Sequence, residues 1–137
     1  MVSEWLQSGI PRLITNDMTI QSESHGDLFV IRPEGDVSKP VAAELDELLD
    51  AAIDDGARLM VFDCSGLTHI SSDGLRVLLK TMRRLRDTDG KATLAGAGDK
   101  VRSVLEAGGF LALLDEFETS DSAVQALLAE RDGEAGH

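Results

Sequence analysis

The sequence is poor in cysteine, in aromatic residues and in basic residues, and each shortage limits what the protein can be. The single cysteine, Cys64, cannot form an intrachain disulfide, which is consistent with a reducing compartment. Aromatic residues make up 4% of the chain and tyrosine is absent, so the core must consist mainly of Leu, Val, Ile and Ala. The 13 basic and 25 acidic residues give a net charge of −12, which argues against general binding to nucleic acid or anionic membranes.

Long apolar runs are also missing. No stretch approaches the ~20 apolar residues that a membrane span needs, and the N-terminus lacks the basic and apolar regions of a signal peptide. We therefore expect a cytoplasmic protein that makes no membrane contact. The 42% hydrophobic content and the length of 137 residues are typical of one globular domain with a single core.

The hydrophobic periodicity predicts an α/β fold. Alternation over residues 18–24, a turn at His25-Gly-Asp and an apolar run over 28–31 indicate a β-hairpin. Strands and helices then alternate, which predicts a mixed central sheet with parallel members, packed against about four α-helices. The later elements are expected as helices starting near 39, 71 or 72, 101 and 120, and as strands over 59–63, 92–95 and 111–114.

The two ends of the chain are expected to lie outside the domain. Residues 1–17 form an N-terminal extension whose apolar residues, Trp5, Leu6 and Ile10, we expect to dock on the domain rather than on a partner. The domain itself covers 18–130, and the polar tail over 131–137 is expected to be frayed.

The segment Val61–Leu75 carries most of the functional information. It predicts a buried strand, a short loop and a helix that opens on Ser71-Ser72-Asp73-Gly74. Functional loops of open α/β sheets lie beyond the carboxyl ends of the strands, where this loop falls. A helix N-terminus favours negative charge, so a serine there is either a place for a phosphate or only an N-cap. The residues alone leave both interpretations open.

Catalytic and metal sites are not indicated. His69 lies near the two serines, but no Gly-x-Ser-x-Gly elbow accompanies it, and we expect a loop residue and no enzyme. The histidines and Cys64 show no ligand spacing, so no metal or cofactor is expected. Gly96-Ala-Gly98 lacks the third glycine of a dinucleotide loop and predicts a tight turn. Cys64 is expected to be a small buried residue rather than a reactive thiol.

One helix face is basic against the acidic background. Five basic residues fall on the expected outer face of the second helix: Arg76, Lys80, Arg83, Arg84 and Arg86. This face is either a solvated surface that keeps the domain soluble or a docking surface beside the serine loop. It is too small to indicate nucleic-acid binding.

The segment Asp63–Leu79 resembles the signature of STAS domains, in particular the anti-sigma factor antagonists of bacteria. Leu28–Val37 is similar to the second strand of that family, and Val101–Phe110 is similar to its third helix. The resemblance covers roughly residues 18–130. It implies a small domain that binds an anti-sigma factor, which is also a serine kinase, and that is released when the kinase phosphorylates one serine. A metal-dependent serine phosphatase restores binding in that family.

The resemblance also implies roles for single residues. The phosphorylated serine of the family falls on Ser72, with Ser71 as a competing acceptor because many members have aspartate there. Asp73 replaces a frequent serine or alanine and puts a fixed negative charge beside the acceptor. The residues that we expect at the partner interface are Ser38, His69, Ser71, Asp73, Gly74, Arg76 and Lys80.

Two other functions stay open beside partner switching. One is a constitutive STAS interaction subunit of a transporter or stress-signalling complex, without phosphorylation. The other is a small-ligand or nucleotide-binding module that uses the turn at Gly96–Gly98.

Overall fold

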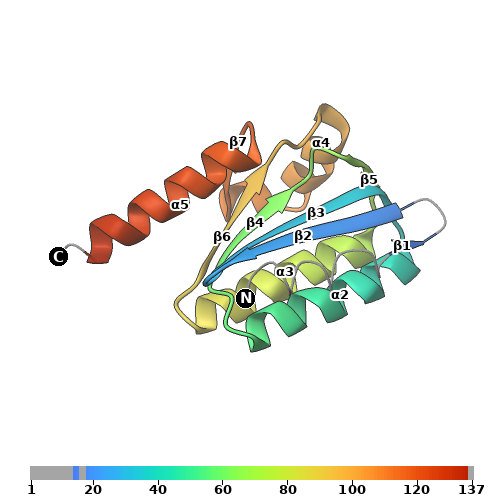
Figure 1. Ribbon diagram of the computed structural model, residues 1–137. Helices are drawn as coiled ribbons and strands as arrows, with labels where there is room; N and C mark the ends of the chain where they lie inside the picture. The colour runs from blue at the N-terminus through green and yellow to red at the C-terminus, as the bar shows by residue number, and fades with distance from the viewer. Residues whose placement is uncertain (1–13, 16–17, 136–137) are drawn as a thin grey trace.

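The computed structural model describes residues 14–15 and 18–135 and contains a mixed β-sheet with helices on both faces (Figure 1). The strands are β1 (Ile14–Thr15), β2 (Met18–His25), β3 (Leu28–Val37), β4 (Leu59–Asp63), β5 (Leu67–Ile70), β6 (Lys91–Ala95) and β7 (Asp115–Phe117). The α-helices of the described part are α2 (Lys39–Asp54), α3 (Ser72–Asp87), α4 (Asp99–Ala107) and α5 (Ser120–Ala135), with a short 3-10 helix, η2 (Phe110–Ala112). The predicted fold class is therefore confirmed.

The sheet is antiparallel at its N-terminal side and parallel elsewhere. Its order is β1-β2-β3-β4-β6-β7, and β5 pairs with the far end of β3. The predicted hairpin is β2–β3, with His25 opposite Leu28 and Gly26 in the turn at φ +66°. The pairs β3–β4, β4–β6 and β6–β7 are parallel, and α2 and α3 provide two of the crossovers.

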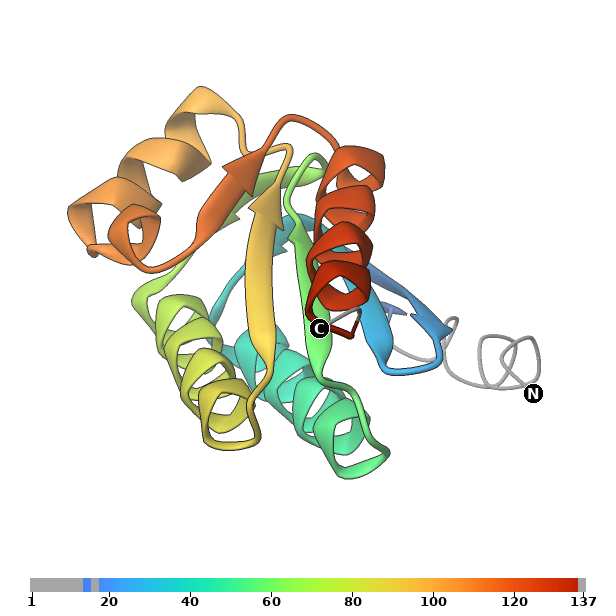
Figure 2. The ribbon, with the colours of Figure 1, turned by 90° about the vertical axis from the view of Figure 1, so that its left-hand side faces the viewer.

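Helices cover the two faces of the sheet unequally. Figure 2 shows α2 and α3 side by side along one face, and α5 alone on the other. The main core lies under α2, α3 and α4, and a smaller core lies under α5, where Ala123 and Leu127 pack against Val30 and Val61. The central strands are therefore apolar on both faces, as the continuous run Leu59–Phe62 predicts.

Two short strands were not predicted. Leu67–Ile70 was expected to be a loop, but it forms β5 and pairs with residues 35–37 of β3 across a bulge. Its two central residues, Thr68 and His69, are exposed, so it carries no apolar alternation that the sequence could reveal. Residues Ile14–Thr15, expected within the extension, form β1 against β2. Trp5, Leu6 and Ile10 lie outside the described residues.

The prediction of a strand over 111–114 is wrong. Residues Phe110–Ala112 form η2, and the amides of Leu113 and Leu114 both donate to the carbonyl of Phe110. Phe110 and Leu114 are both buried at a spacing of four residues, which is the period of a helical turn and not of a strand. The last strand is the polar segment Asp115–Phe117 instead.

The last helix runs past residue 130, the expected end of the domain. The helix α5 spans Ser120–Ala135 and so includes residues 131–135, whereas the domain bounds of 18–130 and the frayed tail stay predictions. Figure 1 shows its last turns projecting beyond the sheet.

Candidate functional site

The serine step lies at the N-terminus of α3 and gives its two hydroxyl groups different surroundings. Ser71 is the N-cap residue, with extended backbone angles of φ −81° and ψ 170°, and its Oγ accepts a hydrogen bond from the Gly74 amide at 3.2 Å. Ser72 is the first helical residue and is exposed, and its side chain has no hydrogen bond to any described residue. The cap therefore uses one hydroxyl, and the other faces solvent.

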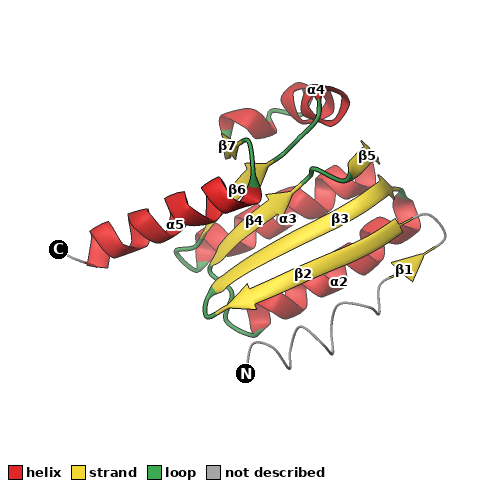
Figure 3. Ribbon diagram, turned by 45° about the horizontal axis from the view of Figure 1, so that its top comes forward, coloured by secondary structure: helices red, strands yellow, loops and turns green. Residues whose placement is uncertain are grey.

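Strand pairing places the starts of α2 and α3 next to each other. Val37 at the end of β3 is paired with Ile70 at the end of β5, and the Ser71 amide donates to the Val37 carbonyl at 3.0 Å. Ser38 and Ser71 each follow one of these paired residues, and each is the N-cap of the next helix. Figure 3 shows both helices starting at the β5 end of the sheet, where two positive helix ends therefore meet.

Gly74 fixes how closely α3 approaches the sheet. It is buried, and a β-carbon at this position would lie 2.8 Å from Ile70 Cγ1 and 2.9 Å from Val37 Cγ1. The glycine of the serine step is therefore a packing residue that lets the first turn of α3 lie against β3 and β5. Its expected role at the partner interface stays a prediction.

The charges beside Ser72 partly cancel. Asp73 lies in the first turn of α3, and one of its carboxylate oxygens is 3.7 Å from Arg76 Nη1. The Arg76 side chain is 74% exposed, so this ion pair is weak and available to a partner. His69 is exposed in β5, in a strand rather than the loop that we expected.

A partly buried ion pair holds the turn that leads to the site. Arg32 Nε donates to Asp63 Oδ2 at 2.8 Å, and the Ser65 amide donates to Asp63 Oδ1 at 3.0 Å. Burial raises the pKa of Asp63, but the hydrogen bonds from Arg32 and Ser65 outweigh it and lower this pKa below its usual 3.8. The carboxylate thus stays charged and holds the turn at Ser65-Gly66 that precedes β5.

Sequence reasoning did not assign this role to Arg32 and Asp63. The register of β3 and β4 explains the pair. Val30 lies opposite Val61, so Arg32 and Asp63, each two residues further along, lie side by side on the same face of the sheet. Gly96 packs against the same turn with φ +70°, where a β-carbon would lie 2.9 Å from Ser65 Cβ. Residues 96–98, predicted as a tight turn, form an irregular link between β6 and α4, and Gly96 packs closely on the Asp63 turn.

Lys80 and Arg84 do not project freely from α3. Lys80 Nζ lies 3.0 Å from both Asp46 Oδ1 and Asp50 Oδ2, and Arg84 pairs with Asp50 and Asp54. These ion pairs join α3 to α2, so two of the five basic residues belong to an interhelical network. The partner-binding role expected for Lys80 stays a prediction, and a partner there has to compete with two aspartates.

The other candidate groups offer little chemistry. Cys64 is buried, and burial followed by the charge of Asp63 raises its pKa to about 12, so the thiol is neutral and the prediction of a buried small residue is confirmed. A cavity of about 440 Å³ lies beside the Gly96–Gly98 turn, but Glu116 and Glu118 line it and Arg102 is paired with Glu116. Two carboxylates disfavour a nucleotide phosphate at that turn.

Metal-binding and membrane-spanning features are absent from the described part of the chain. Residues 14–15 and 18–135 contain no group of three or more His, Cys, Asp or Glu side chains arranged to hold a metal ion. Among these residues no helix combines the length and the apolar character that crossing a bilayer requires.

Comparison with solved structures identifies the same fold in regulators and in transporters. The anti-sigma factor antagonist SpoIIAA in its unphosphorylated form aligns with a TM-score of 0.75 at 20% identity, over 81% of this chain and 97% of that one. The phosphorylated form of SpoIIAA from Bacillus aligns with a TM-score of 0.68 at 19% identity, over 80% and 99%. The STAS domain of a SulP transporter from Vibrio cholerae aligns with a TM-score of 0.65 at 17% identity, over 82% and 90%. At these identities the likeness shows the fold alone.

Comparison of sequences narrows the family. The model of the STAS domain family matches residues 19–123. The Bordetella bronchiseptica protein named "Putative anti-sigma factor antagonist BtrV" is 36% identical over 93 residues, which are 68% of this chain and 80% of that protein. The chain therefore belongs to the STAS domain family, and within it to the anti-sigma factor antagonist type.

Proposed function

We propose that this protein is a partner-switching regulator whose switch is the phosphorylation of Ser72. Unphosphorylated, it binds an anti-sigma factor that is also a serine kinase. The kinase transfers the γ-phosphoryl group of ATP to Ser72 Oγ, which releases ADP and the hydroxyl proton, and the phosphorylated protein dissociates. A metal-dependent serine phosphatase hydrolyses the phosphate ester and restores binding. The protein has no catalytic role in this cycle.

The observation that carries the proposal is that the two serine hydroxyl groups have different surroundings. The Ser71 hydroxyl caps α3, whereas the Ser72 hydroxyl is exposed and has no hydrogen bond within the described part of the chain. A kinase therefore reaches Ser72 without breaking the cap. This supports Ser72 over Ser71 as the acceptor.

The electrostatics at the helix start allow a switch that leaves the fold intact. A phosphate adds about −1.5 to −2 charges, and at an exposed helix N-terminus negative charge is stabilised by ~0.3–1 kcal/mol. At a closed interface the same phosphate would be desolvated beside Asp73, which already carries a negative charge. Phosphorylation is thus expected to weaken the complex and not the domain.

Phosphate transfer by the cognate kinase tests the assignment. Incubation with the kinase and ATP should add one phosphate to the wild-type protein and none to Ser72→Ala. The matched control is Ser71→Gly, because glycine removes the hydroxyl but costs a cap only a few tenths of a kcal/mol. Full phosphorylation of Ser72→Ala at Ser71 would refute the site, and absence of any phosphate on the wild-type protein would refute the switch.

Binding measurements test the consequence of the phosphate. Ser72→Asp should lose kinase binding, while its melting temperature stays within about 1–2 °C of the wild type because a carboxylate is compatible with the first turn. Retained binding by Ser72→Asp, together with retained binding by the phosphorylated wild type, would contradict the proposal.

A constitutive STAS subunit is the second candidate, favoured by the fold shared with the SulP transporter domain. Such a subunit would bind a transporter or signalling complex without being phosphorylated. Recovery of a transporter component in a pull-down from native cells, with no phosphate on Ser72, would favour this candidate over partner switching.

A further inference from the structure

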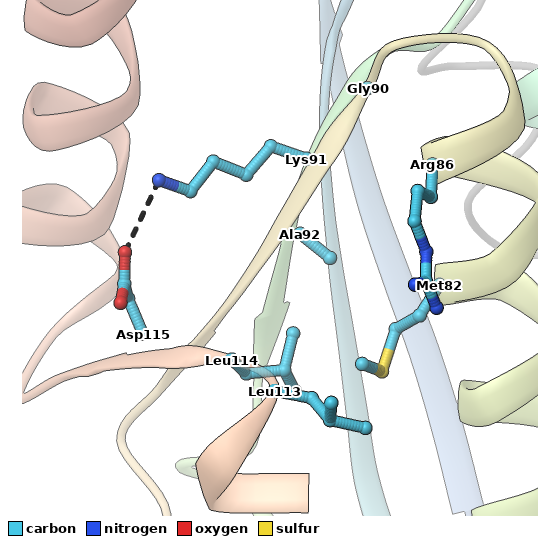
Figure 4. A pocket seen from close by; sticks show the side chains of 8 residues that line it. All are labelled: Met82, Arg86, Gly90, Lys91, Ala92, Leu113, Leu114 and Asp115. Atoms are coloured by element: carbon cyan, nitrogen blue, oxygen red, sulfur yellow. Dashed lines mark ion pairs between the residues drawn. The ribbon is translucent and has the colours of Figure 1, made fainter.

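A groove lies at the C-terminal end of α3, at the opposite end of this helix from Ser72. It has a volume of about 340 Å³ and is lined by Met82 and Arg86 of α3, by Gly90, Lys91 and Ala92 at the start of β6, and by Leu113, Leu114 and Asp115 before and in β7. Figure 4 shows Met82 and Arg86 reaching from one side toward Leu113 and Leu114 on the other. The groove therefore lies between two stretches of the chain, the connection from α3 to β6 and the segment that leads into β7.

The floor of the groove is apolar, and one apolar side chain is left exposed at its rim. Ala92 and Leu114 are buried, Met82 is half-buried, and Leu113 is 57% exposed. Among the described residues, Leu113 is the one large hydrophobic side chain that is mostly exposed. A small molecule is usually enclosed by its site, whereas an apolar floor with an exposed leucine and charged groups at the rim has the layout of a protein interface, an apolar centre inside a polar edge.

The charges at the groove leave one cation uncompensated. Lys91 Nζ is 3.2 Å from Asp115 Oδ2 and 2.7 Å from Glu130 Oε1, so its charge is already shared by two carboxylates. Arg86 is exposed and forms no ion pair with any residue that the structure describes. In a chain with a net charge of −12, a free guanidinium beside an apolar floor is complementary to a carboxylate next to an apolar side chain.

The position of the groove separates it from the serine step. Ser72 is the first residue of α3 and Arg86 is the fifteenth, so a rise of 1.5 Å per residue puts them roughly 20 Å apart along the helix. A ligand in the groove would thus leave the N-terminus of α3 accessible.

We propose that this groove is a second protein-binding site, which takes a short peptide segment of a partner with an apolar side chain beside an acidic residue. The apolar side chain packs on Met82 and Leu114 under Leu113, and the carboxylate accepts hydrogen bonds from Arg86. The site is independent of phosphorylation, so the protein can hold one partner here while another binds at Ser72.

A titration with defined peptides tests the proposal on the full chain. The probe is a synthetic hexapeptide in which glutamates flank two leucines, and the matched probe has lysines in place of the glutamates. In ¹⁵N–¹H correlation spectra the glutamate peptide should produce saturable shifts at the amides of Lys91, Ala92, Leu113 and Asp115, and none at Ser72. The lysine peptide should produce no saturable shifts at these amides.

Two variants, each with one arginine of α3 replaced by glutamine, test whether peptide binding depends on the groove or only on the positive charge of α3. Arg86→Gln should weaken the glutamate peptide about tenfold, the factor expected from one charge-assisted hydrogen bond. Arg83→Gln removes another exposed arginine that has no ion pair with any described residue and does not line the groove, and it should change the affinity less than twofold. Leu113→Ala should also weaken binding. The absence of saturable shifts, equal affinity for both peptides, or equal losses in the two arginine variants would overturn the proposal. None of these outcomes depends on the kinase or on Ser72.

Discussion

Gly74 shows how packing reverses the usual effect of a substitution. Replacing glycine by alanine inside a helix ordinarily gains ~0.5–1 kcal/mol, whereas overpacking a core costs ~1–3 kcal/mol. Because a β-carbon at Gly74 would lie under 3.0 Å from both Ile70 and Val37, we expect Gly74→Ala to lower the unfolding free energy by about 1–2 kcal/mol in urea titrations. Gly98→Ala is the control, since a β-carbon at Gly98 would have no atom within 4 Å, and it should change stability by less than about 1 kcal/mol. A stabilised Gly74→Ala would contradict the close approach of α3 to the sheet.

The two partners of the Arg32–Asp63 pair should not be equally sensitive to substitution. The Asp63 side chain is 7% exposed and that of Arg32 is 26% exposed, so removing the arginine leaves the more deeply buried charge, that of Asp63, without its partner. We expect Arg32→Met to cost about 3 kcal/mol, and Asp63→Asn about 1–2 kcal/mol because Arg32 still reaches water. Chemical denaturation of both variants measures the difference. Equal losses would show that the burial of Asp63 does not decide the energetics of the pair.

At the scale of elements, the ion pairs between α2 and α3 should make their association depend on salt. Lys80 and Arg84 together contact three aspartates of α2, all partly or fully exposed to solvent. Each such pair contributes ~0.2–1 kcal/mol, so Lys80→Gln with Arg84→Gln should lose about 1–2 kcal/mol at low ionic strength. This loss should shrink in about 1 M NaCl, where the screening length falls to ~3 Å. Arg83→Gln, which removes an arginine of the same helix that forms no ion pair within the described part of the chain, should show no such salt dependence in thermal melts.

For the whole molecule, the lowered pKa values of Asp63 and Asp50 predict a loss of stability in acid. Burial raises both pKa values, but the hydrogen bonds from Arg32 and Ser65 to Asp63, and from Arg84 and Lys80 to Asp50, lower them below 3.8. A carboxyl group whose pKa is lower in the folded than in the unfolded state contributes stability above the unfolded value and loses it as the pH falls through the folded value. The unfolding free energy should therefore decline below about pH 4.

The matched variant for this acid transition is Asp63→Asn. It is less stable than the wild type at pH 7, and the difference between the two proteins should narrow as the pH falls below about 4, because the wild-type carboxylate is then protonated as well. Urea titrations of both proteins between about pH 2.5 and 7 measure this. A constant difference across that range would show that the charge of Asp63 does not stabilise the fold.

Several features of the fold and of the site could be predicted from the local sequence. The apolar periods of β2, β3, β4, α2 and α3 predicted the order of these elements, because each period reports which face of an element is buried. The start of α3 at Ser71 or Ser72 followed from the capping preference of serine, and the burial of Cys64 followed from its place at a strand end. The motif around Ser72 also predicted the family, which the comparisons confirmed.

The remaining features required the tertiary structure, because they depend on residues that only folding brings together. Leu67–Ile70 is a strand only because the end of β3 provides a partner for it, and its own exposed residues carry no strand pattern. Lys80 forms ion pairs with aspartates of α2 that are 30 and 34 residues away, and Arg32 of β3 pairs with Asp63 of the neighbouring strand β4. The sequence by itself determined most of the helices and longer strands and the serine step, through local periodicity and capping. Only the packing of the helices on the sheet decided which charges are paired among the described residues and where Arg86 borders an apolar groove, because these contacts join residues that are distant in sequence.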